Sequence, residues 1–449
     1  MEKWFLILAV YLSTSVFAYN VYVGNQGGTD NTVNVINSAT DTLTTTVTVG
    51  TEPIAIAVTP DGTKVYVVNN VSGTVSVINP ITNAVIATIP VQTAPLSIAI
   101  TPNGTKAYVS NSGDDTVSVI NTSSDTVVAT ISVGNFPRNI SITPDGAKAY
   151  VSNRGADTVS VINTSTDSVI TTVTVGAEPG YSAITPDGTK LYVLAADEGV
   201  VSVVSTSSDT VITAVPIPAV SPSVLIMTPD GSQVYVTGQG GSTVDVVNTT
   251  SNTLTTTISV GTTPVQLAAT PDSTKVYVAN VASSNVSVIS TVSNTVTATI
   301  PVGANPVFVA ITPDGTKAYV ANFLSGSVSV VNISTNTVST TVNVEGGPAV
   351  IAIQELITLS APSAFSGTQK NNNFGLVGEY YNTLTWTAPS YAVSAYYLKR
   401  NGIRIATLTG VTTSYEDHNQ PSTPVVYTIS AVSRSGTESV TATTTVPRN

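Results

Sequence analysis

The chain has 449 residues, of which only 9% are charged, and its formal net charge is −11. This acidic balance disfavours nucleic acid and anionic membrane surfaces as partners. The chain has no cysteine and a single histidine, His418, which excludes disulfides and thiol chemistry and leaves few ways to build a transition-metal site or a histidine-activated nucleophile. We therefore expect neither a metal nor a cofactor.

Residues 1–18 have the pattern of a secretory signal peptide. A short charged start is followed by the apolar run Trp4–Leu12, and Val16 and Ala18 supply small residues for cleavage after Ala18. A membrane anchor and a β-strand are the alternatives, but the apolar run is too short to span a bilayer, and the repeats start directly after it. We expect a protein that is secreted or held at the cell surface, or located in the periplasm, with no membrane span after cleavage.

Residues 19–357 are repetitive. The dipeptide Tyr-Val recurs at Tyr22, Tyr66, Tyr108, Tyr150, Tyr192, Tyr235, Tyr277 and Tyr319. Between these copies the turn Thr-Pro-Asp-Gly, or a close variant, begins at Thr59, Thr101, Thr143, Thr185, Thr228, Thr270 and Thr312. The repeat length is therefore about 42 residues, which suits one four-stranded β-unit and indicates a propeller or solenoid.

A single repeat contains four predicted strands. In the repeat that starts at Pro95 they cover residues 95–101, 106–110, 116–120 and 126–133. Each run is rich in Val, Ile, Thr and Tyr and is bounded by Gly, Pro, Asn or Asp. In the Thr-Pro-Asp-Gly turn, Pro presets φ and Gly takes the positive φ that reverses the chain.

The order of strands at the two ends predicts how a ring would close. The chain enters at a second strand, with Tyr22, and leaves through an inner-type strand at residues 348–353. Pairing these two segments completes one sheet and removes two exposed edges. We predict an all-β fold with an eight-bladed β-propeller; seven blades is the alternative if one terminal unit stays outside the ring.

The repeats resemble those of the YVTN β-propeller family. The similarity rests on the Tyr-Val-x-Asn copies, such as the one ending at Asn111, on the Thr-Pro-Asp-Gly turns, and on Thr-Val-Ser-Val-Ile-Asn segments such as residues 116–121. The resemblance implies an extracellular propeller of the kind found in surface-layer and secreted proteins.

Residues 358–449 have a different composition. Trp386 lies in the segment Leu384–Pro389, and Tyr427 lies in Val426–Val432. An early Trp, a late Tyr and regular turn signals are typical of an immunoglobulin-like β-sandwich. The segment resembles a fibronectin type III domain, which implies a spacer or an adhesion unit.

A few residues of the repeat region are not required by the repeat itself. They are the aromatic and basic residues Phe136, Arg138, Arg154, Tyr181, Phe308 and Phe323, and the acidic pair Asp114 and Asp115. Strand order places all of them on the face opposite the Asp-Gly turns, with Tyr181 and Phe308 near the channel mouth. Arg and aromatic residues are enriched at binding hot spots. The alternative is drift in loops that little constrains. Other aspartates, such as Asp125 and Asp167, are expected to serve only the turns.

These observations favour a non-enzymatic binding or adhesion protein whose propeller is an interaction platform. The expected partner is a protein or a glycan at the cell envelope or outside the cell. Two alternatives stay open: an exported propeller enzyme of the lactonase or hydrolase type, and a structural component of a surface layer.

Overall fold

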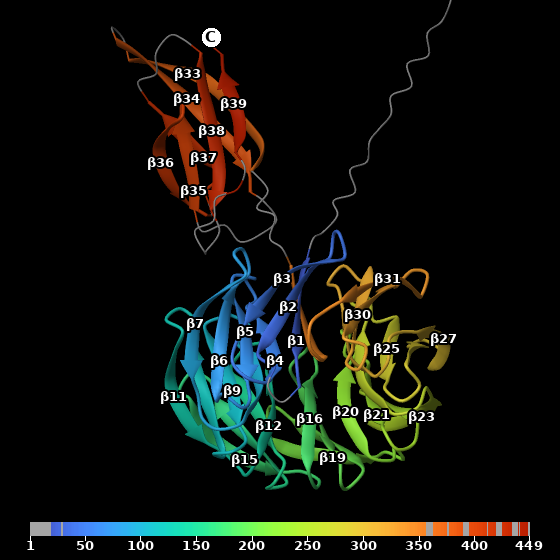
Figure 1. The fold of residues 1–449 in the computed structure, drawn as a ribbon. Coiled ribbons are helices and arrows are strands. Elements are labelled where there is room, and N and C mark those ends of the chain that lie inside the picture. The colour runs from blue at the N-terminus through green and yellow to red at the C-terminus, as the bar shows by residue number, and fades with distance from the viewer. Residues whose placement is uncertain are drawn as a thin grey trace, which may run out of the picture. The chain divides into compact units, whose positions relative to one another are not determined.

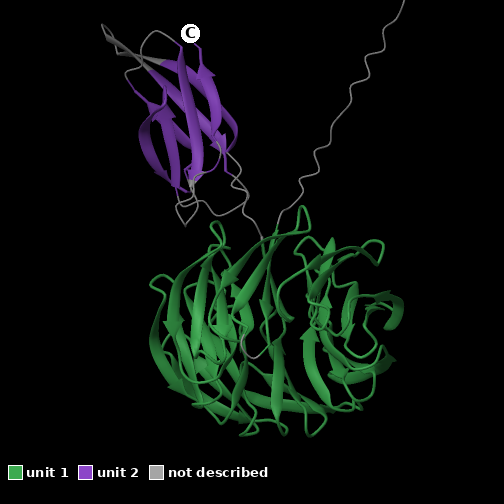
Figure 2. Cartoon of the chain, viewed as in Figure 1, with its two compact units in different colours: residues 1–356 green, residues 357–449 purple. Residues whose placement is uncertain are grey.

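The computed structural model describes residues 19–27, 30–355, 362–374, 377–388, 395–410, 412–418, 424–432, 439 and 441–447. The expected signal peptide, residues 1–18, lies outside these ranges. The chain divides into two compact units, residues 1–356 and residues 357–449 (Figure 2). Among the described residues, no helix is long and apolar enough to cross a membrane.

The first unit contains, within residues 19–27 and 30–355, eight antiparallel sheets of four strands each. The innermost strands are β32 (Pro348–Glu355), β4 (Pro53–Val58), β8 (Pro95–Ile100), β12 (Pro137–Ile142), β16 (Pro179–Ile184), β20 (Pro222–Met227), β24 (Pro264–Ala269) and β28 (Pro306–Ile311). The second strands are β1 (Tyr19–Asn25), β5 (Val65–Asn69), β9 (Lys106–Asn111), β13 (Lys148–Asn153), β17 (Lys190–Ala195), β21 (Gln233–Gly238), β25 (Lys275–Asn280) and β29 (Lys317–Asn322).

The third and fourth strands lie farther from the axis. The third strands are β2 (Thr32–Asn37), β6 (Thr74–Asn79), β10 (Thr116–Asn121), β14 (Thr158–Asn163), β18 (Val200–Ser205), β22 (Thr243–Asn248), β26 (Asn285–Ser290) and β30 (Ser327–Asn332). The outermost strands are β3 (Thr42–Thr48), β7 (Ala84–Pro90), β11 (Thr126–Ser132), β15 (Ser168–Thr174), β19 (Thr210–Pro216), β23 (Thr253–Ser259), β27 (Thr295–Pro301) and β31 (Thr337–Asn343).

The sheets follow one another in chain order around a central axis (Figure 1). Each innermost strand contacts the innermost strand of the next sheet, and β28 and β4 both contact β32, so the series is circular. The second and third strands are buried almost throughout, whereas the outermost strands alternate between exposed and half-buried residues. This gradient explains the sequence: Val, Ile and Tyr fill the packed middle of each sheet, and Thr dominates its outer edge.

The ring closes through its two ends, as the strand order predicted. β32 pairs with β1 in antiparallel register, with Tyr22 opposite Ala352 and Val21 opposite Ile353. β1 in turn pairs with β2, so the first sheet has the strand order β3-β2-β1-β32. Ile351 is buried in the same apolar cluster as Val21 and Val23, so closure also joins the hydrophobic cores of the first and last sheets.

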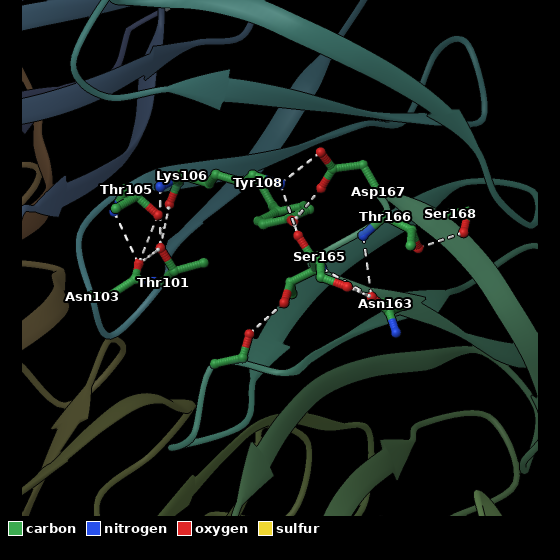
Figure 3. Close-up of polar contacts among 12 residues, drawn as sticks. Thr101, Asn103, Thr105, Lys106, Tyr108, Asn163, Ser165, Thr166, Asp167 and Ser168 are labelled. Carbon is green, nitrogen blue, oxygen red and sulfur yellow. Dashed lines mark hydrogen bonds and ion pairs between the residues drawn. The ribbon is translucent and has the colours of Figure 1, made fainter.

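Neighbouring sheets are joined by a repeated polar contact that we call the latch. In it a Tyr of one second strand binds an Asp or Asn in the third-to-fourth turn of the next sheet, and in most copies a Lys of the same strand also bonds to that turn. In one copy, the Lys106 Nζ donates to Asp167 Oδ2 at 2.7 Å and the Tyr108 hydroxyl donates to Asp167 Oδ1 at 2.6 Å (Figure 3). Lys106 also donates to the carbonyl of Thr164 at 2.8 Å. The latch thus satisfies a buried phenol and a half-buried ammonium with one carboxylate.

The latch recurs around the ring with two kinds of acceptor. Asp accepts the Tyr hydroxyl in the pairs Tyr66–Asp125, Tyr108–Asp167, Tyr150–Asp209 and Tyr319–Asp41. Asn accepts it in the pairs Tyr22–Asn83, Tyr192–Asn252, Tyr235–Asn294 and Tyr277–Asn336. The expectation that Asp125 and Asp167 serve only the turns was wrong, because each joins its own sheet to the preceding one.

The acceptor residues of the latch also adopt a positive φ. Asp125, Asp167 and Asn252 have φ values of 52°, 52° and 53°. Asp and Asn tolerate this left-handed region better than other non-glycine residues, because their short polar side chains bond locally. An acceptor side chain and a positive φ are therefore required at one position, which restricts it to these two residue types.

The second unit is a sandwich-like pair of sheets. One sheet has the order β33 (Ser363–Phe374), β34 (Val377–Thr387), β37 (Ser414–Asp417), and the other has the order β36 (Ile403–Thr409), β35 (Ala395–Arg400), β38 (Val425–Val432), β39 (Ala442–Val446). Trp386 lies edge-on to Tyr396, with ring centroids 5.4 Å apart. Both rings are buried in one cluster with Leu384 and Tyr427, so Trp386 and Tyr427 lie in the core of this unit.

Removal of β32 tests closure. A chain that ends at residue 347 leaves the inner edge of β1 unpaired and exposes Ile351's former neighbours Val21 and Val23. We expect its free energy of unfolding to fall by more than about 5 kcal/mol, because several buried aliphatic side chains and a full strand of hydrogen bonds are lost. The matched control is a chain that ends at residue 356, which lacks the second unit but keeps β32. Thermal unfolding and light scattering compare the two; equal melting temperatures and no self-association would refute this role of β32.

The latch predicts alkaline unfolding. Burial raises the pKa of Tyr192 and of Tyr277 to about 12, and at Tyr108 burial and the neighbouring Asp167 carboxylate raise the pKa still further. In the unfolded chain these phenols ionise near pH 10, so their contribution to stability is complete below about pH 10 and is lost as the pH rises toward the folded pKa. Each such Tyr then lowers the free energy of unfolding by roughly 1.4 kcal/mol per pH unit.

Urea unfolding at increasing pH, followed by circular dichroism and by phenolate absorbance, measures this effect. We expect phenolate formation and loss of β-structure to coincide, and Tyr192→Phe to reduce the steepness. Phenolate appearing while the β-signal is intact would contradict the prediction.

Candidate functional site

We define the loop face as the loops that join second to third strands and those that join one sheet to the next. Of the predicted site residues, Asp114, Asp115, Phe136, Arg154 and Phe323 lie in these loops, and Arg138, Tyr181 and Phe308 lie in the innermost strands. The loop that carries Phe136, between β11 and β12, contacts the loop between β9 and β10 and the loop between β13 and β14. The Phe136 amide donates to Asp115 Oδ1 at 2.8 Å, and the Phe136 carbonyl accepts from the Arg154 amide at 3.0 Å. Phe136, Asp115 and Arg154 are thereby brought together, as strand order predicted.

Asp114 and Asp115 have structural partners in these loops. The Thr93 amide donates to Asp114 Oδ2 at 2.6 Å, and the Thr93 hydroxyl donates to the same oxygen. These hydrogen bonds lower the pKa of the Asp114 carboxyl. The same contact is made elsewhere in the ring by Ser72, Glu198, Ser283 and Ser325, each of which accepts from an amide in the adjacent loop. Loop capping therefore accounts for Asp114 without a ligand.

Phe136 is an aromatic residue in an unusual backbone conformation. Its φ is 53° and its side chain is 43% exposed. Positive φ recurs at this place in other sheets, where the residues are Glu52, Ala94, Glu178, Ser221, Thr263 and Asn305. A bulky residue in the left-handed region costs roughly 1–2 kcal/mol. The repeat thus sets the backbone here, and the exposed ring is an addition that the repeat does not explain.

Arg154 is paired with a neighbouring loop. Its Nη2 lies 2.5 Å from Glu178 Oε2, and its Nε donates to the same oxygen at 3.1 Å. The Glu178 amide donates to Asp157 Oδ1 at 3.0 Å, which fixes the loop that carries the carboxylate. Both charged side chains are more than a third exposed, so the pair is accessible at the loop face, and solvent limits its contribution to stability.

Arg138 and Tyr181 contact each other across two innermost strands. The Arg138 guanidinium lies over the Tyr181 ring, 5.7 Å from its centroid. Arg138 falls in a register irregularity of β12 between Pro137 and Ile140, and Tyr181 falls in one of β16 between Pro179 and Ser182. Such irregularities re-aim side chains, and here they bring a cation and an aromatic face together.

Phe308 and Phe323 lie elsewhere in the ring. Phe308, on β28, packs against the buried cluster that contains Tyr319 and Ile351. Phe323 packs on Gly347, where an added Cβ would lie 2.6 Å from its ring. Both belong to the sheet β28-β29-β30-β31, which neighbours the closing sheet, so they are not next to Arg138 on β12.

Asp245 is a buried carboxylate that sequence reasoning missed. It is fully buried, its Oδ1 accepts from the Thr257 hydroxyl at 2.5 Å, and its Oδ2 accepts from the Ala219 amide at 2.8 Å. Burial raises its pKa above the usual value. The signal was visible, since Thr-Val-Asp-Val at residues 243–246 replaces the usual Thr-Val-Ser-Val. In the part of the chain that the structure describes, no group of three His, Cys, Asp or Glu could hold a metal.

A family model and solved structures resemble this chain. A model described as a YNCE-like β-propeller matches residues 6–104 and 83–201. The fold is a β-propeller. No curated protein matches the chain.

The solved structures similar to this propeller are distant in sequence. Hydrazine synthase of Kuenenia stuttgartiensis is 23% identical over 62% of this chain and 95% of its own, with a TM-score of 0.54. The dihydro-heme d1 dehydrogenase NirN, in complex with DHE, is 12% identical over 75% of both chains, with a TM-score of 0.63. Apo AztD of Citrobacter koseri is 17% identical over 75% of this chain and 98% of its own, with a TM-score of 0.60. At these identities the likeness shows the fold alone.

Backbone strain at Phe136 has a measurable consequence. Phe136→Gly and Phe136→Ala both remove the ring, but only glycine relieves the positive φ. We expect Phe136→Gly to be more stable than Phe136→Ala by about 1 kcal/mol, measured by denaturant unfolding. Val71, an exposed loop residue without positive φ, is the matched control. At Val71 the Ala variant should be the more stable one, because glycine loses more conformational entropy on folding. The same order at both positions would show that Phe136 is not strained.

Proposed function

We propose that the protein is a secreted or surface-exposed binding and adhesion protein without enzymatic activity. In this proposal the first unit is an eight-bladed propeller of the YVTN type, and the second is a fibronectin type III-like module that serves as a spacer or adhesion unit. The partner is a protein or glycan at the cell envelope or outside the cell, and the loop face is the platform that it contacts.

The observation that carries the proposal is Phe136, an exposed aromatic ring kept in a left-handed backbone conformation beside Arg154. The positive φ recurs at the equivalent position of other sheets and belongs to the repeat. The exposed ring does not, and it gains little for the fold, so a role in binding accounts for it better. Aromatic and Arg side chains are the commonest anchors of protein interfaces. The opposite face is occupied by latches, whose charged groups are already paired.

The test is binding of the mature protein to arrays of glycans and envelope proteins, followed by affinity measurement with the partner found. We expect Phe136→Ala and Arg154→Ala to weaken binding by at least about thirtyfold, which corresponds to about 2 kcal/mol per anchor. Ile81→Ala is the control: Ile81 is 63% exposed in a third-to-fourth-strand turn on the opposite face. A control that weakens binding equally would refute the loop face as platform.

The alternatives have separate readouts. If the wild type turns over lactones or esters, and substitutions on the loop face abolish this activity, the protein is an enzyme and the binding proposal is wrong. Ordered arrays of the purified protein, unaffected by Phe136→Ala, would replace it by a structural role.

A further inference from the structure

Arg138 differs from the other basic residues of the propeller. Within residues 19–27 and 30–355, every other Lys or Arg side chain is hydrogen-bonded to a carboxylate, an amide oxygen or a carbonyl. These contacts are Lys64–Asp125, Lys106–Asp167, Lys148–Asp209, Lys190–Asn252, Lys275–Ile333, Lys317–Asp41 and Arg154–Glu178. Among the same residues, the Arg138 guanidinium has no hydrogen-bonded or ion-paired partner and rests on Tyr181 alone. In a chain of net charge −11, a half-buried cation without a carboxylate is an exception.

The backbone fixes the position of this cation. The Ser110 hydroxyl of the preceding sheet donates to the Arg138 carbonyl at 2.8 Å. Pro137 restricts φ immediately before it, and the β12 irregularity releases Arg138 and Asn139 from the β13 ladder. The Tyr181 ring also packs against buried residues of its own sheet and of the following sheets. The guanidinium therefore rests on a packed aromatic ring before any ligand arrives.

Uncharged polar side chains occupy neighbouring positions of the same two innermost strands, β12 and β16. Asn139 Oδ1 accepts from the Ser182 amide at 3.1 Å and from the Ser182 hydroxyl at 2.8 Å. The Ser141 and Ser182 hydroxyls lie 2.8 Å apart. With its oxygen engaged in this way, the Asn139 amide group has its nitrogen left as a donor, and no described residue accepts from it. The innermost strands β4, β28 and, up to residue 353, β32 have no polar side chain. The strands β8, β20 and β24 have one each, Ser97, Ser223 and Gln266, so polar side chains are most concentrated on β12 and β16.

We propose that Arg138 and Asn139 bind the carboxylate of a sugar acid, with the Ser141 and Ser182 hydroxyls next to the sugar's own hydroxyl groups. A guanidinium presents two parallel N–H donors that match a carboxylate. One cation without a second basic neighbour suits a monoanion better than a phosphate dianion, since the acidic chain would leave the second charge uncompensated. The stacked Tyr181 holds the guanidinium plane and is a positioning residue. This site goes beyond the proposed platform and does not depend on Phe136.

The test is calorimetric titration of the mature protein, at low ionic strength, with sodium glucuronate, trigalacturonate, glucose and sodium phosphate. We expect both sugar acids to bind and glucose not to bind. If trigalacturonate binds much more tightly than glucuronate, the natural source is an acidic polysaccharide, and equal affinities indicate a free sugar acid. No binding of either sugar acid, or tighter binding of phosphate, overturns the proposal.

Variants assign the binding to this site. Arg138→Gln should weaken binding of the sugar acid at least tenfold, and Arg138→Lys should be intermediate because it keeps the charge and loses the paired donors. Tyr181→Phe keeps the stacked ring and should bind as the wild type does, whereas Tyr181→Leu should weaken binding. Val292→Ala, at an exposed residue of the turn between β26 and β27, is the control and should leave the titration unchanged. Equal affinity of Arg138→Gln and wild type, with both folded by circular dichroism, would refute the assignment.

Discussion

The latch between neighbouring sheets is the interaction on which this propeller depends. Each copy places a buried Tyr hydroxyl and, in most sheets, a Lys ammonium of one sheet on an acceptor of the next, as Tyr108 and Lys106 do on Asp167. A hydrogen bond to a charged group contributes about 1.5–3 kcal/mol, and partial exposure of the Lys keeps the ion pair itself at the low end. The latch matters because it crosses a boundary that is filled mainly by apolar packing, and because it repeats.

The latches divide the molecule into two faces of different character. Charges on the turn face are used to hold the ring together, so substitution there acts first on stability. On the loop face, capping by Ser72, Asp114 or Ser325 needs only one acceptor per loop, and the other loop positions are free to change. Phe136 and Arg138 flank Pro137, so the residue that exposes an aromatic ring and the residue that lacks an anion belong to one short segment. The residues of this segment are the ones that the repeat pattern requires least.

Much of the fold follows from the sequence because its signals are local and repeated. The turn at Thr101–Gly104 fixes a hairpin, the Tyr-Val copies identify the buried second strands, and Trp386 identifies the core of the second unit. Closure was predictable as well, since an entry at a second strand leaves one inner position vacant.

The sequence did not reveal the contacts between residues that occupy different positions in two neighbouring repeats. Asp167 reads as a turn residue within its own repeat, and only the curvature of the ring places it against Tyr108 of the preceding one. The Arg138–Tyr181 contact likewise joins two sheets. The register irregularity that follows the first Pro of each innermost strand takes part in it, but which side chains then meet across the boundary depends on the curvature of the ring. The positive φ at Phe136 was hidden because the residue there is atypical, although Asn305 at the equivalent place is a usual choice.

The pairing of β1 with β32 also has a consequence for how the molecule comes into being. Tyr22 is among the first residues of the ring to be made, and its strand partner Ala352 is among the last. During vectorial synthesis the first sheet therefore waits, with an open edge, until the rest of the ring has been polymerised. Contacts this distant in sequence form slowly, since the loop between them must first be closed. A nascent chain of this kind favours a folding order in which the middle sheets assemble first and the oldest sheet is completed last.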